Sequence, residues 1–320
     1  MRILITGSSG FIGYHLCEQL LKDENIFIIG LDNMNNYYDV NLKISRLHNL
    51  KLKKNFKFIK ADINNTNKLQ SIIKNYKINY VIHLAAYVGS LHDNIDNRTL
   101  YFDKNILMNT IITKYSYESG VKNFLGILST CIYPDNVAAF PIKEESLHDG
   151  APHPDLMSYA YAKRSHAVQL TAYKEAYGVN YNYLIPCNLY GLASEEHKGR
   201  SHFVNDLIQK IIVAKRSNQN HITLFGDGSP LRQFMYSGDL AMVIKTFVDE
   251  RYTNSFNVAP DVNLSVNDIA LVALNACDAE SMAIKYDASK PNGQQRKDVD
   301  TTKLKSCMPR IEFRDLATGI

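Results

Sequence analysis

The sequence predicts an α/β protein built on a doubly wound parallel sheet, followed by a smaller α/β portion near the C-terminus. Two observations support this prediction. Short apolar runs alternate with helix-length segments over the first 130 residues, and the alternation becomes irregular after about residue 190. With 320 residues, 45% hydrophobic and 21% charged, the chain has the length and composition of one large globular domain or two smaller ones.

The first part of the chain alternates between predicted strands and predicted helices. Apolar runs with the length of buried strands occupy residues 2–6, 26–32, 56–62, 80–86 and 123–129. Apolar residues at helical spacing predict helices at 11–22, about 66–76 and about 98–119. Continuous apolar strands joined by helices are typical of a parallel sheet that is covered on both faces.

The second part of the chain has a weaker pattern. The segment GLASEEHKGRSH, residues 191–202, predicts a long polar loop. A short strand is expected at 222–225 and a helix at 237–250. The last residues, FRDLATGI, have the pattern of a helix that has only begun, so we expect a C-terminus that is cut short.

Composition and charge argue against several classes of protein. The five cysteines are scattered without a CxxC pair, which argues against a disulfide framework and a zinc site, so no metal is expected. The chain begins with a strand instead of a leader, and its apolar runs are too short for a membrane span, so we expect a cytoplasmic protein. The net charge of +4 is diffuse, and its densest run, KLKK at 51–54, is interpreted as a solvated connection and not as a nucleic-acid site.

A glycine-rich turn directly after the first predicted strand indicates a phosphate-binding loop. Gly7, Gly10 and Gly13 lie in GSSGFIG, between this strand and the first helix. Glycines permit a tight turn, and they let backbone amides and the helix N-terminus face a pyrophosphate. This context predicts a Rossmann-type NAD(P)-binding domain at residues 1–188. Residues 189–320 are then expected mainly to bind substrate, with the chain returning to the first domain near 236–258.

An aspartate at the end of the second predicted strand favours NAD as the cofactor. Asp32 can accept hydrogen bonds from the adenosine ribose, and its charge would repel a 2′-phosphate. Lys43 and Arg46 follow in the sequence, so NADP is not excluded. Asp62, at the end of the third predicted strand, is expected either to reach the adenine or to cap the next helix. The other residues expected to contact the dinucleotide are Phe11, Ile12, Asn33, Ile63, Leu84, Ala85, Ala86, Asn105, Pro186, Asn188 and Leu189.

A tyrosine and a lysine four residues apart predict an acid–base pair that also contacts the cofactor. Tyr159 and Lys163, in SYAYAKRS, share one face of a predicted helix. A tyrosine is a poor acid or base near neutral pH unless its anion is stabilised, which a neighbouring ammonium and a positively charged nicotinamide would do. An ordinary exposed helix face can show the same spacing, so the order of the motifs matters. The glycine turn comes first, then a strand ending at Ser129, then this pair.

This order resembles the extended short-chain dehydrogenase/reductase family, and the middle and later segments resemble GDP-L-fucose synthases in particular. The similar stretches lie within roughly residues 80 to 310 and include AAYVGS, STCIYP, PCNLYG, FGDGSPLRQFMYSGDLA and SKPNGQQRKDVDTTKL. The resemblance implies that Ser129, Tyr159 and Lys163 form the catalytic triad. It also implies that Cys131 and His202 form a proton-transfer pair. Taken alone, Cys131 would be interpreted as a packing residue and His202 as a structural residue at a helix N-terminus.

The implied chemistry is consistent with these residue types. A 4-ketone acidifies the carbons on either side of it, so inversion at C3 or C5 needs a base on one face and an acid on the other. A thiol and an imidazole titrate close enough to neutral pH for these roles. The leading interpretation is an epimerase/reductase that acts on a GDP-4-keto-6-deoxy-sugar.

The N-terminal segment keeps a second interpretation open. The stretch GLDNMNNYYDVNLKISRL resembles NAD-dependent UDP-glucuronate 4-epimerases, whereas fucose synthases usually take hydride from NADPH. A redox-neutral 4-epimerase would need only Ser129, Tyr159 and Lys163. A third interpretation is a non-catalytic nucleotide-binding protein on the same fold, and the intact triad argues against it.

The resemblance also implies a nucleotide-sugar site and a homodimer. Phe225 and Arg232, in FGDGSPLRQF, match the aromatic and arginine positions that hold guanosine diphosphate, and an arginine can bind two diphosphate oxygens at once. Lys297 is expected to be a second phosphate contact. Helices near 98–119 and 158–177 would form the four-helix dimer contact. The residues expected to bind substrate are Val88, Ser129, Asn188, His202, Phe225, Arg232 and Lys297.

Overall fold

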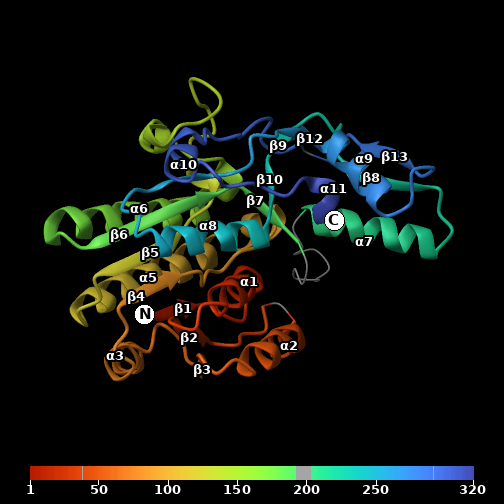
Figure 1. Ribbon diagram of the computed structural model, residues 1–320. Helices are drawn as coiled ribbons and strands as arrows, with labels where there is room; N and C mark the ends of the chain where they lie inside the picture. The colour runs from red at the N-terminus through yellow and green to blue at the C-terminus, as the bar shows by residue number, and fades with distance from the viewer. Residues whose placement is uncertain (38, 192–202, 291) are drawn as a thin grey trace.

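The computed structural model describes residues 1–37, 39–191, 203–290 and 292–320 and is built around a seven-stranded sheet (Figure 1). The strand order is β11-β6-β5-β4-β1-β2-β3, and every neighbouring pair is parallel. The strands are β1 (Arg2–Thr6), β2 (Phe27–Asp32), β3 (Phe56–Lys60), β4 (Tyr80–His83), β5 (Asn123–Ile127), β6 (Asn180–Pro186) and β11 (Phe256–Val258). This topology confirms the predicted doubly wound fold of the Rossmann type.

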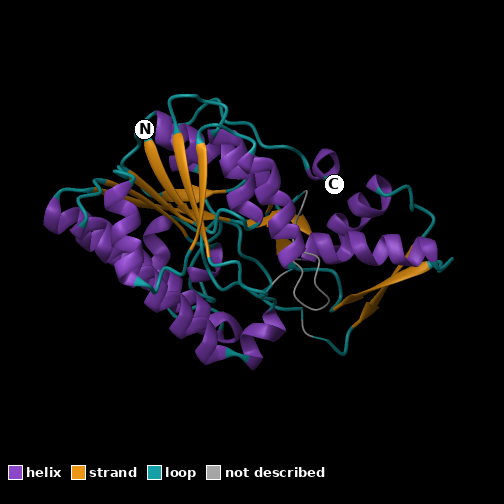
Figure 2. Ribbon diagram, turned by 90° about the horizontal axis from the view of Figure 1, so that it is seen from below, coloured by secondary structure: helices purple, strands orange, loops and turns teal. Residues whose placement is uncertain are grey.

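Helices cover both faces of the sheet, as Figure 2 shows. One face carries α1 (Phe11–Leu20), α2 (Val40–Lys51) and α8 (Ser237–Asp249). The other face carries α3 (Thr66–Asn75), α5 (Arg98–Glu118) and α6 (Met157–Tyr177), with the short α4 (Leu91–Asp96) before α5. In β1 and β4 nearly every residue is buried, as expected for strands between two layers of helices.

Three strands end two or three residues earlier than the apolar runs predict, because polar side chains turn the chain toward the site. After β3, the Asp62 carboxylate accepts a hydrogen bond from the Asn64 amide (2.8 Å). After β4, the Thr6 hydroxyl accepts from the backbone amide of Ala85 (3.2 Å). After β5, the Ser129 hydroxyl accepts from the Cys131 amide (3.4 Å) and begins a 3₁₀ turn over Thr130–Ile132. The bonds of Asp62 and Ser129 are local, whereas that of Thr6 comes from the neighbouring strand β1; all three occur where a strand ends.

A smaller group of elements forms a separate hydrophobic cluster, on the right of Figure 1. The helices in it are α7 (Phe203–Arg216), α9 (Val266–Ala276) and α11 (Leu316–Gly319). Three short strand pairs accompany them: β8 (His221–Phe225) with β13 (Ala283–Asp287), β7 (Asn188–Tyr190) with β10 (Phe234–Tyr236), and β9 (Leu231–Arg232) with β12 (Leu264–Ser265). A last helix, α10 (Thr302–Cys307), packs on β11 of the large sheet.

The chain passes back and forth between this smaller group and the large sheet. After β10 it returns as α8, which packs on α1, and then as β11 at the sheet edge. It returns again near residue 299, where Val299 and Leu304 join the core cluster of the large sheet. Lys297, one of the predicted substrate contacts, therefore directly precedes a segment that is anchored to the large sheet.

Candidate active site

A cleft lies at the carboxyl ends of the central strands, the usual ligand position in open α/β sheets. The loops after β1, β2, β3 and β4 line it. The lining residues that the sequence predicts as ligand contacts are Gly7, Gly10, Phe11, Ile12, Gly13, Asp32, Asn33, Asp62, Ile63, Leu84, Ala85, Ala86 and Val88. Residues from four separate loops thus meet at one cleft.

The glycine-rich turn has the close backbone approach that a pyrophosphate requires. Gly7 has a φ of +69°, and an added Cβ there would lie 2.9 Å from the backbone nitrogen of Ala85. A Cβ added at Gly13 would lie 2.1 Å from the carbonyl oxygen of Gly7. Side chains at these two positions would fill the turn, so its residues fit a dinucleotide whose phosphates face the N-terminus of α1.

Asp32, predicted to bind the adenosine ribose, lines the cleft and is held in place by backbone amides. Its carboxylate accepts hydrogen bonds from the backbone amides of Ser9 (3.3 Å) and Met34 (2.8 Å). The next residue, Asn33, donates from its side chain to the Asp62 carboxylate (3.1 Å). The cap of α3 is Asn65 and not Asp62, which lines the cleft instead. The helix-cap alternative for Asp62 is therefore wrong.

The two basic residues after Asp32 are engaged with the loops around it. Lys43 donates to the backbone carbonyl of Asn35 (3.1 Å) and to the side-chain oxygen of that residue (3.2 Å). The Arg46 guanidinium donates to the carbonyl of Ser9 (3.1 Å). Both side chains are buried. The positive charges of Lys43 and Arg46 are therefore held on the loops around the fixed Asp32 carboxylate.

A bridge of tyrosine and aspartate crosses the cleft. The Tyr37 hydroxyl bonds the Asp93 carboxylate and the Tyr101 hydroxyl, and Tyr101 bonds the same carboxylate. Tyr37 follows β2 and Asp93 lies in α4 after β4, whereas β1 lies between these two strands. This Tyr37–Asp93–Tyr101 bridge therefore joins the two sides of the cleft across the end of β1. The Tyr37 ring also meets that of Tyr87, another lining residue, with 6.3 Å between centroids.

Asn105 fixes one wall of the cleft from behind. It is fully buried and does not line the cleft. Its side-chain oxygen accepts from the Tyr87 amide (3.0 Å), and its nitrogen donates to the Tyr87 carbonyl (3.0 Å). Asn105, which the sequence predicts as a cofactor contact, therefore supports the cleft wall by fixing the backbone of Tyr87.

The predicted serine, tyrosine and lysine come from one strand end and one helix. Tyr159 and Lys163 lie in α6, and both are buried. The Lys163 ammonium donates to the carbonyl of Ile127 (2.9 Å), two residues before Ser129. Arg164, the next residue, donates to the carbonyls of Ile132 (2.8 Å) and of Gly150 (2.8 Å). Consecutive residues of α6 therefore hold both ends of the turn that carries Ser129.

Burial lowers the pKa of Lys163 to about 8, because the charged form loses its hydration. The Lys163 charge also acts on His83 at the end of β4, whose pKa falls to about 3, mainly through its own burial. The neutral His83 ring bonds the Thr6 hydroxyl (2.7 Å) and the Asn109 side chain (3.0 Å). Asn109 in turn donates to the carbonyl of Ala162 (3.2 Å). A buried polar chain therefore connects the end of β1 with α6, which carries Tyr159 and Lys163.

Cys131 lies in the 3₁₀ turn that follows Ser129, within electrostatic range of two lysines. Burial raises the pKa of its thiol, whereas the Ser129 hydroxyl and the charges of Lys297 and Lys163 act to lower it. Lys297 has its own pKa lowered to about 8 by burial and by the charge of Arg232. The predicted partner of Cys131, His202, lies outside the described residues.

Three of the predicted dinucleotide contacts do not line the cofactor cleft. Pro186 ends β6, and Asn188 and Leu189 begin β7. The residues predicted for the nucleotide-sugar end are also absent from its lining. Phe225 ends β8 with its side chain half-exposed, and the Lys210 ammonium lies 5.3 Å from its ring centroid. Arg232 in β9 has its pKa lowered to about 10 by burial, and its charge acts on Lys297. Arg232 and Lys297 thus form a cationic pair.

Several cleft residues are not among the predicted contacts. They are Leu31, Asn35, Tyr37, Ala61, Asn64, Tyr87, Lys104 and Met108. Lys104 and Met108 are four residues apart on α5, so this spacing was an available signal for the face of α5 that meets the cleft. Tyr37 and Tyr87 follow strands that the sequence predicts, but no spacing rule relates two loops 50 residues apart.

No group of three or more histidine, cysteine or acidic side chains that could hold a metal occurs in the described part of the chain. All five cysteines are free thiols. Among the helices of the described ranges, none combines the length and the apolar character needed to cross a bilayer.

Comparisons with known proteins agree with this geometry. The model of the "NAD dependent epimerase/dehydratase family" matches residues 3–259. The chain is 36% identical over 266 residues to GDP-L-fucose synthase of Dictyostelium discoideum, covering 81% of each chain. It is 33% identical over 238 residues to UDP-glucuronate 4-epimerase of Thermodesulfobacterium geofontis, covering 74% of this chain and 68% of that protein. Its fold matches the crystal structure of a GDP-L-fucose synthetase from Naegleria fowleri with a TM-score of 0.80 at 25% identity, covering 99% and 91% of the two chains.

Proposed function

This chain belongs to the NAD dependent epimerase/dehydratase family and is an NAD(P)-dependent enzyme, and we propose that it is an epimerase/reductase of a GDP-4-keto-6-deoxy-sugar. The observation that carries the proposal is the turn after β5. It presents Ser129 and Cys131 two residues apart, and α6, which carries Tyr159 and Lys163, holds both of its ends. A serine that can hydrogen-bond the ketone oxygen and a thiol that can transfer a proton, both on one turn, suit a reaction with two half-steps.

The reduction half-step uses the side chains of α6 and the turn. NAD(P)H, when bound, supplies the hydride for C4 of the sugar. Tyr159 supplies the proton for the C4 oxygen, so that the ketone becomes a hydroxyl. The Lys163 ammonium stabilises the phenolate that remains, and Ser129 donates a hydrogen bond to the same sugar oxygen.

The epimerisation half-step uses Cys131. Its thiolate takes the proton from the carbon beside the ketone, and the electrons of that C–H bond move into the enolate oxygen, which Ser129 and Tyr159 stabilise. An acid on the other face then returns a proton to carbon with inversion. We propose His202 for this role.

The nucleotide end of the substrate is proposed to bind between the small strands and the segment before α10. Arg232 and Lys297 form a cationic pair that a diphosphate would neutralise. Phe225, with its half-exposed ring, is proposed to stack on the base. The similarity to fucose synthases over 81% of the chain favours guanine as this base.

A redox-neutral nucleotide-sugar 4-epimerase is the second candidate. The observation that favours it is the fixed carboxylate of Asp32, which suits NAD. The similarity to a UDP-glucuronate 4-epimerase over 74% of the chain agrees with it. Such an enzyme would oxidise and re-reduce one sugar carbon without consuming the cofactor.

Incubation with GDP-4-keto-6-deoxymannose and NADH or NADPH in D₂O tests the proposal. Mass spectrometry reads carbon-bound deuterium, and absorbance of the reduced cofactor reads hydride transfer. We expect the wild-type enzyme to do both and Cys131→Ser to lose most deuterium incorporation, because a serine hydroxyl is too weak an acid–base group at neutral pH. If no carbon-bound hydrogen exchanges, the epimerase assignment fails. Turnover of a UDP-sugar without net cofactor use would then support the 4-epimerase.

We also propose a homodimer formed through α5 and α6, which pack side by side. Both helices expose large apolar side chains, among them Leu107 at 50% and Val168 at 51%. Analytical ultracentrifugation tests this proposal by comparing the molecular mass of the wild type with that of a Leu107→Glu, Val168→Glu double variant. A wild-type monomer at micromolar concentration would contradict the dimer.

A further inference from the structure

The turn that carries Cys131 is fixed from two directions. On the side of α6, Lys163 and Arg164 hold the carbonyls at its ends, as described above. On the opposite side, the Tyr133 hydroxyl donates to the side-chain oxygen of Asn257 in β11 (2.6 Å), and both side chains are buried. This second contact joins residues 124 apart in the sequence.

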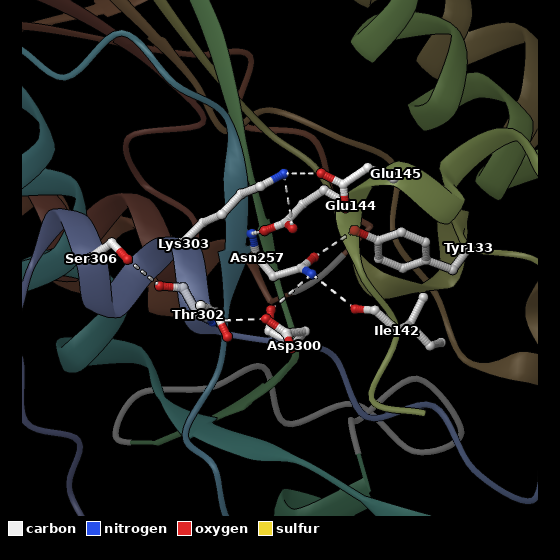
Figure 3. Close-up of polar contacts among 9 residues, drawn as sticks. All are labelled: Tyr133, Ile142, Glu144, Glu145, Asn257, Asp300, Thr302, Lys303 and Ser306. Atoms are coloured by element: carbon white, nitrogen blue, oxygen red, sulfur yellow. Dashed lines mark hydrogen bonds and ion pairs between the residues drawn. The ribbon is translucent and has the colours of Figure 1, made fainter. Parts of the chain in front are cut away.

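Asn257 uses both polar ends of its side chain and its backbone amide in this region (Figure 3). Its side-chain nitrogen donates to the carbonyls of Ile142 (3.2 Å) and Asp300 (3.0 Å). Its backbone amide donates to the Glu144 carboxylate (2.8 Å). The residue is fully buried, so each of these bonds replaces one to water. A buried amide bonded through both ends has one allowed orientation, which makes Asn257 a rigid junction.

The junction also fixes the segment that carries Lys297. Ile142 pairs with both neighbours of Val299: its amide donates to the Asp298 carbonyl (2.9 Å), and its carbonyl accepts from the Asp300 amide (2.8 Å). Gln233 accepts from the Val299 amide (2.9 Å). Outside the junction, Lys303 forms an ion pair with Glu144 (3.3 Å) and bonds Glu145, as Figure 3 shows. Lys297 precedes this fixed stretch directly.

We propose that Asn257 is a positioning residue for epimerisation. It fixes the Cys131 turn and the Lys297 segment relative to each other, so that the thiol and the ammonium face the same sugar diphosphate. The inference rests on the proposed function and extends it to residues that touch neither cofactor nor substrate. Asn257 acts on the thiol through Tyr133 and on the lysine through Asp300 and Ile142. Tyr159 and Lys163, the groups proposed for hydride transfer, lie on α6, and Lys163 bonds the Ile127 carbonyl at the other end of the turn from Tyr133.

The experiment compares Tyr133→Phe with Tyr181→Phe in the cofactor-bound enzyme. Tyr133→Phe removes one hydroxyl from the junction and keeps the ring. Tyr181 is equally buried and donates to a backbone carbonyl, that of Val121 (3.1 Å), so its variant loses a comparable bond elsewhere. Asn257→Asp is the second variant, because it keeps the acceptor for Tyr133 and removes the donor for Ile142 and Asp300.

Four readouts separate positioning from a merely structural role. We expect Tyr133→Phe and Asn257→Asp to lower deuterium exchange about tenfold or more, while hydride transfer and NADH binding change little. Without substrate, alkylation of Cys131 by iodoacetamide, followed on its own peptide, should need a higher pH in these variants. Tyr181→Phe should match the wild type in all four.

Parallel loss of exchange and hydride transfer would overturn the positioning role. So would an unchanged alkylation profile of Cys131, or an equal loss of exchange in Tyr181→Phe. If the wild type exchanges no carbon-bound hydrogen, the proposed function fails, and the alkylation profiles still decide whether Asn257 controls the thiol.

Discussion

At the scale of single residues, burial changes the pKa of Lys163 in this site. Only 2% of the residue is exposed, and its ammonium donates to the carbonyl of Ile127. Burial disfavours its charged form and brings the pKa to about 8, whereas a lysine in water titrates near 10.4. The group is therefore charged at neutral pH with little margin.

Because the pKa of Lys163 lies only slightly above neutral pH, we expect hydride transfer to depend on pH. Lys163 is protonated below its folded-state pKa of about 8 and loses its charge as the pH rises through that value. The phenolate of Tyr159 then loses its counter-charge, so we expect the rate of ketone reduction to fall above about pH 8. Rapid-mixing measurements of cofactor absorbance across pH check this. Cys131→Ser should keep the same fall, and a rate that stays constant well above that pH would contradict the prediction.

Tyr159→Phe tests the acid directly. The change removes only the phenolic proton, so cofactor binding should persist while reduction slows by roughly 10²–10⁴-fold, the usual contribution of general acid–base catalysis. Tyr161→Phe on the same helix is the matched control, since its ring, 5.3 Å from the Arg164 guanidinium, remains. Activity of Tyr159→Phe within a few-fold of the control would show that Tyr159 is not the acid.

Asp32 predicts the choice of cofactor. Its carboxylate is fixed by the amides of Ser9 and Met34 at the ribose end of the cleft, so its charge cannot move away from a 2′-phosphate. We expect NADH to bind more tightly than NADPH and Asp32→Ala to narrow the difference. Fluorescence titration with both cofactors measures this. Equal or tighter binding of NADPH to the wild type would mean that Lys43 and Arg46 outweigh the carboxylate.

At the scale of elements, the loops after β2 and β4 contribute more to the cofactor cleft than the strands themselves. The Tyr37–Asp93–Tyr101 bridge connects these loops across the end of β1, the strand that leads into the glycine-rich turn. We therefore expect the bridge to slow the departure of a dinucleotide from the cleft.

Tyr37→Phe should accordingly speed the release of NADH. The variant keeps the ring and its contact with Tyr87 and removes the bonds to Asp93 and Tyr101. We expect the dissociation rate, measured by displacement in stopped-flow fluorescence, to rise severalfold, while the unfolding temperature changes little. Tyr14→Phe, which removes a hydroxyl bonded to Glu18 on α1, serves as control. Equal dissociation rates in all three proteins would mean that the bridge does not govern release.

At the scale of the whole molecule, sequence and structure agree wherever the information is local. The glycine-rich turn, the strand ending at Asp32 and the Tyr159–Lys163 spacing are each contained within one element or one turn. The Tyr37–Asp93–Tyr101 bridge and the Asn257 junction combine segments that no periodicity relates. The strand ends were predicted too late, because the side chains of Thr6, Asp62 and Ser129 turn the chain while it is still apolar.

The repeated passage of the chain between its two parts predicts cooperative unfolding. Residues 235–259 and 299–308 complete the core of the large sheet, although the smaller cluster interrupts them in sequence. A fragment of residues 1–188 would lack β11 and α8 and should not fold. Calorimetry of the full chain should give one transition, with equal calorimetric and van 't Hoff enthalpies. Two separate transitions would show that the parts are independent.

The Asn257 junction has one more consequence, which concerns the edges of the large sheet. An open edge strand offers unpaired amides to which another chain can add. At the β11 edge, the Glu144 carboxylate accepts a hydrogen bond from the backbone amide of Asn257, and α10 lies against the strand. At the opposite edge, β3 carries two exposed lysines, Lys57 and Lys60, whose charges repel a second copy of the same strand. Both edges of the large sheet are thus protected against the addition of a strand from another chain, and so against aggregation by this route.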